Sequence, residues 1–84
     1  MDPGWNTFAQ LCRKEFDRCG FPAELIRACG GHQDIAWALY FHMCEGAIAW
    51  LQRSVPALSG RTPASLIEEG RADEVRYCLW SMPC

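Results

Sequence analysis

The sequence AWLQRSVPALSGRTP, residues 49–63, marks the end of one helix, a tight loop and the start of the next helix. An apolar Trp-Leu pair closes the first helix, and prolines and a glycine shape the loop because they restrict or free the backbone. The threonine followed by a proline predicts a helix start, with threonine as N-cap and proline at the first helical position. We expect the loop scaffold to consist of Pro56, Gly60, Thr62 and Pro63. A segment that specifies a shape rather than a reaction favours a binding module.

Around this loop the chain is predicted to be all-α, because no stretch alternates with the period of a strand for long enough. The third helix is apolar nearly all round, which is typical of a helix central to its domain, and Gly46 predicts a kink or a close helix crossing there. Residues 1–84 are therefore expected to form a single domain, a small compact bundle of about five helices around that central apolar helix. The expected helices span residues 6–19, 22–29, 33–53, 63–69 and 71–82.

Glycines are expected to end three of these helices, because glycine readily adopts the left-handed backbone of a helix C-terminus. They are Gly20, the Gly30–Gly31 pair and Gly70. The first helix is predicted to bury one stripe at spacings of three and four, made of Phe8, Leu11, Cys12, Phe16 and Cys19. The last helix is predicted to bury Ala72, Val75, Cys78, Leu79 and Met82.

Composition limits the classes of function. Eight basic and ten acidic residues give a formal charge of −2, which argues against a dominant nucleic-acid footprint. No apolar run reaches the roughly 18–20 residues of a membrane span, and the N-terminus lacks the features of a signal peptide. We therefore expect a cytoplasmic protein that binds no membrane. A homodimer is also expected, because a small domain with four tryptophans gains stability by burying more surface.

Six cysteines and two histidines raise the question of metal or thiol chemistry. Cys29-x-x-His32 and His42-x-Cys44 do not follow the usual order of zinc ligands, and the second pair diverges on a helix. We predict reduced, mostly structural thiols, with Cys84 exposed and oxidisable. No arrangement of nucleophile and base or of paired carboxylates favours catalysis. The sequence predicts no enzyme, no cofactor and no metal.

DNA binding is the next alternative, because the first helix carries Arg13, Lys14 and Arg18. Glu15 and Asp17 interrupt these cations, and phosphate contacts need clustered positive charge. A solvated helix face is the simpler interpretation, so we do not expect DNA as a partner.

The last helix carries the best candidate for a partner surface. Tyr77 and Trp80 lie off its buried stripe, beside Arg76, and aromatic residues dominate interface hot spots. The alternative is that both aromatic side chains cover the first helix. Arg61 has two interpretations as well: it either binds a carboxylate on a partner or donates to carbonyls of its own loop, and we favour the internal role.

The loop and its flanks resemble the C-terminal toxin-binding domain of the MbcA/ParS/Xre antitoxins. The resemblance is strongest over residues 43–82 and rests on the segment PALSGRTP, with Ser59 where the family more often has a second glycine. It extends to flanking residues: Trp50, Leu51, Leu66, Ile67, Gly70 and Val75. The residues before this region include the central helix and leave too little chain for a separate DNA-reading domain. We therefore do not expect this chain to share the autoregulation that such a domain would provide.

The resemblance implies an antitoxin-like, non-enzymatic inhibitor that binds a protein. In the family this domain binds a RES-fold toxin that degrades NAD, and its C-terminal part blocks the entrance to the toxin's active site. The last helix would then be presented to the partner, with the tail from Ser81 to Cys84 near the toxin's pocket. The partner-binding residues predicted on these grounds are Arg61, Arg76, Tyr77, Trp80 and Met82.

An inhibitor of a host defence complex is the alternative from another class. Mobile elements reuse small interaction domains, and phage-encoded anti-CRISPR proteins are commonly small, single-domain and non-catalytic. This alternative would use the same fold against a different macromolecule, such as one with a basic nucleic-acid-binding surface.

Overall fold

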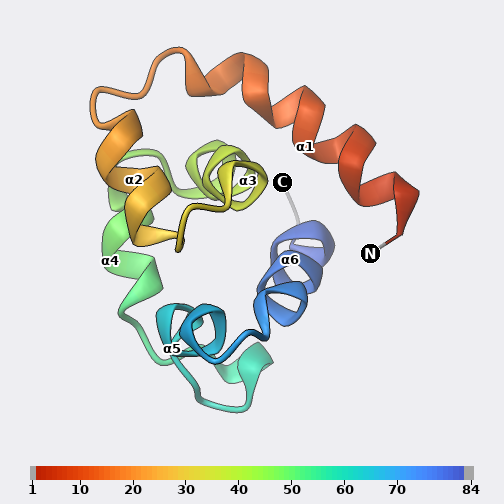
Figure 1. Ribbon diagram of the computed structural model, residues 1–84, viewed down its shortest axis with the longest axis vertical. Coiled ribbons are helices and arrows are strands. Elements are labelled where there is room, and N and C mark those ends of the chain that lie inside the picture. Colours follow the sequence, from red (N-terminus) through yellow and green to blue (C-terminus); the bar gives the residue numbers. More distant parts are fainter. Residues whose placement is uncertain (1, 83–84) are drawn as a thin grey trace.

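Helix α3 (Gln33–Met43) runs through the middle of the molecule and the other helices surround it, as Figure 1 shows in the computed structural model. The structure describes residues 2–82, and within that range it contains helices and turns but no strand. The all-α prediction is therefore confirmed. The other elements are α1 (Pro3–Phe16), α2 (Pro22–Ala28), the 3-10 turn η1 (Cys44–Gly46), α4 (Ala47–Leu51), the 3-10 turn η2 (Pro56–Leu58), α5 (Pro63–Glu68) and α6 (Ala72–Ser81).

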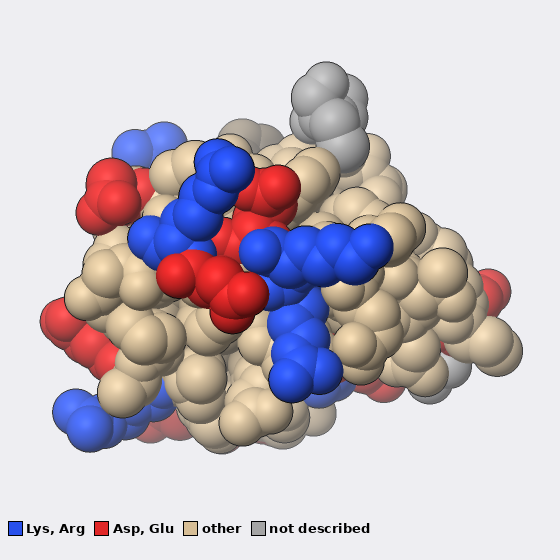
Figure 2. Space-filling view, turned by 90° about the horizontal axis from the view of Figure 1, so that it is seen from above, with Lys and Arg blue, Asp and Glu red and all other residues tan. Residues whose placement is uncertain are grey.

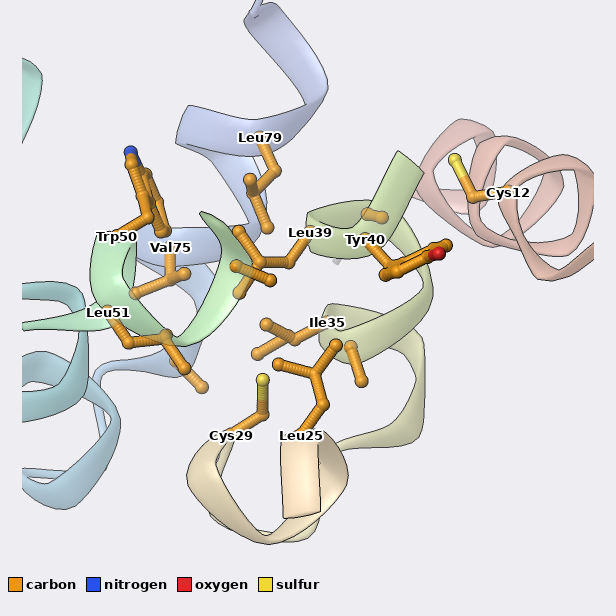
Figure 3. Close-up of a cluster of buried hydrophobic side chains, with 14 of the residues drawn as sticks. Cys12, Leu25, Cys29, Ile35, Leu39, Tyr40, Trp50, Leu51, Val75 and Leu79 are labelled. Atoms are coloured by element: carbon orange, nitrogen blue, oxygen red, sulfur yellow. The ribbon is translucent and has the colours of Figure 1, made fainter. Parts of the chain in front are cut away.

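The hydrophobic core gathers around α3, as the sequence predicted for its apolar central helix. α3 contacts α1, α2, α4 and α6, and it buries five of its eleven residues: Ile35, Ala36, Ala38, Leu39 and Tyr40. Figure 3 shows side chains from the surrounding helices converging on Ile35 and Leu39, with Val75 and Leu79 reaching in from α6. This packing fixes α6 against the centre of the molecule.

The central helix is shorter than predicted, because the expected helix over 33–53 breaks after Met43. Cys44 has a φ of +48°, which a right-handed helix cannot accommodate, and the chain passes through η1 before α4 begins. The break turns α4 so that Trp50 and Leu51 reach the core. The expected kink thus lies at Cys44–Gly46. The alternative prediction, that another helix crosses close to Gly46, is wrong, because a Cβ added at this glycine would meet no atom within 4 Å.

Helix α1 begins and ends three residues earlier than predicted. Asp2 caps it by accepting from the Gly4 N–H at 2.7 Å, and Pro3 follows at the first position. Of the predicted stripe, Cys12 and Cys19 are buried and Phe8 and Phe16 pack against the core, and the buried face also includes Trp5 and Ala9. Leu11, predicted to be buried, is 57% exposed. The prediction that Gly20 ends this helix is also wrong, because the helix ends at Phe16.

The other predicted helix ends are close to the observed ones. Gly30 and Gly70 adopt left-handed φ angles of +67° and +80° after α2 and α5. The Thr62 hydroxyl accepts from the Ser65 N–H at 3.2 Å, which confirms the predicted N-cap of α5. These caps place α5 against α6, and the loop that contains η2 lies below both helices in Figure 1.

Candidate partner-binding site

A groove of about 390 Å³ lies between the η2 loop and the outer face of α6. The groove's position follows from the sequence. Leu58, at the end of η2, is buried and anchors the loop, while α6 packs its buried stripe against α3 and leaves another row of side chains facing the loop. The lining residues are Ala57, Leu58, Asp73, Glu74, Tyr77, Cys78 and Ser81. The predicted loop and the predicted presenting helix therefore meet at one surface.

The loop wall of the groove is held by its own backbone. The Val55 N–H donates to the Arg61 carbonyl at 3.1 Å, and the Gly60 N–H donates back to the Val55 carbonyl at 3.0 Å. Ser59 and Gly60 both take positive φ angles, +57° and +78°, which close the turn. These hydrogen bonds close the loop at Gly60, and Thr62 and Pro63 then begin α5.

Arg61 bonds inside the molecule, but to a different acceptor from the one expected. Its guanidinium pairs with the carboxylate of Glu69, at the end of α5, and not with carbonyls of its own loop. The side chain is still 43% exposed, so it also borders solvent. Its role toward a partner stays a prediction.

The two aromatic side chains of α6 have different environments. Tyr77 is 62% exposed and forms a wall of the groove. Trp80 is half-buried and packs against the core, and a Cβ added at Gly4 would lie 2.7 Å from its ring. The interpretation that the aromatic side chains cover the first helix holds for Trp80, whereas Tyr77 is mostly exposed and its contact with a partner stays a prediction.

Arg76 lies at the centre of an internal network with only 15% of its side chain exposed. Its Nε donates to Asp34 at 2.8 Å, Nη1 donates to Asp73 at 2.8 Å and Nη2 lies 3.1 Å from His32 Nδ1. The Trp5 indole N–H also donates to Asp34, at 2.9 Å. Sequence reasoning missed Asp34 and Trp5, because nothing local in the sequence pairs residues this far apart.

The charge of Asp34 is set by this network. Burial by itself would raise the pKa of the Asp34 carboxyl, but hydrogen bonds from Arg76 and Trp5 and the charge of Arg76 outweigh it and hold the pKa below its usual value of 3.8. The same carboxylate raises the pKa of Arg76. The pair is therefore ionised at neutral pH, and it ties α6 to α3 and α1.

Met82, the last of the predicted contact residues, is half-buried and packs against the core. The rest of the predicted tail, Pro83 and Cys84, lies outside the described residues.

The basic side chains of α1 and of the turn after it are interleaved with acidic ones, as expected. Figure 2 shows the end of the molecule that α1 covers, where Lys and Arg lie beside Asp and Glu. Arg18 lies 3.7 Å from Glu15, and the Arg13 guanidinium lies 5.3 Å from the centre of the Trp37 ring. This face carries mixed charge rather than a continuous cationic surface.

Of the residues considered as metal ligands, Cys29 is buried in the core and His42 is hydrogen-bonded to the backbone. Cys29 is fully buried, and burial followed by the charge of Asp34 raises the pKa of its thiol to about 12. His42 Nε2 lies 2.9 Å from the Leu79 carbonyl and must donate to it, since a carbonyl only accepts. Within residues 2–82, no three His, Cys, Asp or Glu side chains gather as a metal site would require.

Comparison with known proteins places this groove within a recognised domain. A family model described as the antitoxin Xre/MbcA/ParS C-terminal toxin-binding domain matches residues 41–82, close to the range of the predicted resemblance. No curated protein and no solved structure matches the chain. In the part of the chain that the structure describes, every helix is too short or too polar to cross a membrane. The matched range includes every residue that lines the groove.

Proposed function

The chain belongs to the Xre/MbcA/ParS family of antitoxin C-terminal toxin-binding domains, which supports an antitoxin-like role in binding a protein. We propose that it neutralises a toxin by covering the entrance to the toxin's active site. The observation that carries the proposal is the position of the groove. Its loop wall and its helix wall both lie inside the matched range, and an exposed aromatic side chain, Tyr77, stands in the helix wall.

The proposed mechanism is steric and involves no chemistry in this chain. A preformed surface binds with little loss of conformational freedom, because its loop and helix are already fixed. Leu58 anchors the loop wall in the core, and the Arg76–Asp34 pair holds the helix wall. The resemblance noted in the sequence favours a RES-type, NAD-degrading toxin as the partner. We propose no catalytic residue for this chain.

Affinity purification of the tagged protein from its host, with mass spectrometry of the captured proteins, tests the proposal. We expect a RES-type toxin in the captured fraction. Co-expression with that toxin should then restore growth and cellular NAD, whereas toxin alone should deplete NAD. Recovery of a CRISPR or other defence complex instead would overturn the antitoxin proposal and support an inhibitor that reuses the fold.

The homodimer and the cytoplasmic location expected from the sequence stay predictions. Leu11 and Phe41 are exposed apolar side chains on α1 and α3, away from the groove lining, and they support a contact between copies. Sedimentation equilibrium of the purified protein measures the oligomeric state directly. A monomer at all concentrations would contradict the homodimer.

A further inference from the structure

We propose that the groove between η2 and α6 binds a segment of the partner protein in which an apolar residue and a lysine or arginine stand two positions apart. This inference rests on the proposed protein-binding function and adds the chemistry of the partner. It comes from the division of the groove into an apolar part and an acidic end.

The apolar part lies beside Tyr77. Leu58 forms a floor that is almost completely buried, Cys78 is half-buried and Ala57 borders the loop side. Tyr77 stands beside them with most of its ring in solvent, and its only ring contact with another aromatic residue in the described chain is with Trp80, at 6.2 Å. A rigid aromatic wall next to an apolar floor is the usual setting for an apolar anchor at an interface.

The acidic end lies at the beginning of α6. Asp73 and Glu74 line it, and none of the described lining residues is basic. Arg71 neutralises Glu74 by bonding to both of its oxygens, whereas Arg76 donates to Oδ1 of Asp73 and leaves that side chain 65% exposed. Asp73 is therefore the carboxylate that remains accessible to a cation, and opposite charge across an interface selects the partner and its register.

The spacing along α6 sets the spacing expected in the partner. Asp73, Tyr77 and Ser81 are four residues apart, so they form one row along the groove. One step in this row rises about 6 Å along the helix axis. In an extended chain, residues i and i+2 point to the same side and lie about 6.5–7 Å apart. An apolar residue beside Tyr77 thus places a cation two residues away next to Asp73.

Backbone amide spectra of the ¹⁵N-labelled protein, recorded during titration with short peptides, test the inference without the toxin. The probe is acetyl-Gly-Ser-Leu-Ser-Lys-Gly-amide, and the matched controls replace its lysine with glutamate or its leucine with glycine. We expect the probe to shift signals of Leu58, Asp73 and Tyr77, and the glutamate peptide to bind roughly fivefold more weakly. Equal binding of both peptides, shifts confined to other residues, or no shift at millimolar peptide would overturn the proposal.

Asp73→Asn is the decisive variant, because an asparagine keeps an oxygen that can accept from Arg76 and removes the charge. It should bind the lysine and glutamate peptides equally, while Glu24→Gln, an exposed acid on α2, should keep the preference for lysine. An otherwise unchanged spectrum shows that each variant folds. A preference for lysine that survives in Asp73→Asn would overturn the role of the acidic end.

These results separate the two proposals. If the peptide preference holds and no RES-type toxin binds, the proposed function fails while the groove assignment stands. If a toxin binds Asp73→Asn as tightly as the wild type, the groove assignment fails while the function stands. Concentration-dependent shifts of Leu58 and Tyr77 without peptide would assign the groove to a second copy of this chain and overturn the inference.

Discussion

Arg76 donates two hydrogen bonds to Asp34 although the two residues are 42 positions apart: Nε to Oδ2 at 2.8 Å and Nη2 to Oδ1 at 3.3 Å. Asp34 lies in the first turn of α3. Arg76 lies in α6, next to Tyr77, which lines the groove. The remaining donors to Asp34 are the Trp5 indole and the backbone N–H of Ile35. One carboxylate therefore connects the central helix, the first helix and the helix that carries Tyr77.

Asp34→Ala should lower the free energy of unfolding by about 2–3 kcal/mol, because it leaves the mostly buried guanidinium of Arg76 and the Trp5 indole without their acceptor. Urea denaturation followed by tryptophan fluorescence measures the change. Asp73→Ala is the matched control, since it removes the exposed partner of the same arginine and should cost less than about 1 kcal/mol. Equal losses in the two variants would show that Asp34 has no special role.

Acid should weaken this connection in a defined range of pH. The pKa of Asp34 is lowered by folding, so its carboxylate stabilises the folded state above the ordinary pKa of 3.8, and this contribution is lost as pH falls through the lower folded pKa. Melting temperatures of the wild type and of Asp34→Asn, measured from about pH 6 to about pH 2, should converge below about pH 4. Curves that stay parallel to the lowest pH would contradict this assignment.

Local signals in the sequence predicted more of the fold than of the site. Thr62, Gly30 and Gly70 were assigned correctly because caps depend on the residue and its near neighbours. A kink was expected at Gly46, but the complete break of the helix at Cys44 was missed, since a cysteine gives no local sign that its φ will be positive. Leu11 was misplaced because the buried face through Phe8, Cys12 and Phe16 extends toward Trp5 and Ala9 and leaves Leu11 outside it.

The site depended more on tertiary contacts. The exposure of Tyr77 agrees with its position off the buried stripe of α6, which the sequence alone indicated. The pairing of Asp34 with Arg76 and the contact of Trp80 with Gly4 join residues far apart in the sequence, and they arise only when α1, α3 and α6 pack together. Spacing within one helix carries no information about such pairs.

Ser59→Gly should stabilise the protein by about 0.5–1 kcal/mol. Serine has a φ of +57° here, and relief from this left-handed conformation outweighs the extra freedom that glycine gives the unfolded chain. Thermal unfolding should show a rise of about 2–8 °C for a domain of this size. The φ angle also gives a physical reason for a glycine at this position in the family.

Gln52→Gly is the matched control for this loop. Gln52 is exposed and has a φ of −97°, so glycine brings no relief there and should destabilise the protein by about 0.5–1 kcal/mol. If both glycine variants shift the melting temperature in the same direction, backbone strain at Ser59 is not the cause.

Tyr77→Ala and Trp80→Ala should separate binding from stability. Tyr77 is mostly in solvent, so its removal should change the free energy of unfolding by less than about 0.5 kcal/mol. Trp80 packs over Gly4 and against the core, so its removal should cost about 2–3 kcal/mol. Affinity for the captured toxin, measured by calorimetry on folded variants, should fall at least about tenfold for Tyr77→Ala. If the Tyr77→Ala variant binds the toxin as tightly as the wild type, Tyr77 is not part of the toxin interface, and the groove does not provide the apolar anchor.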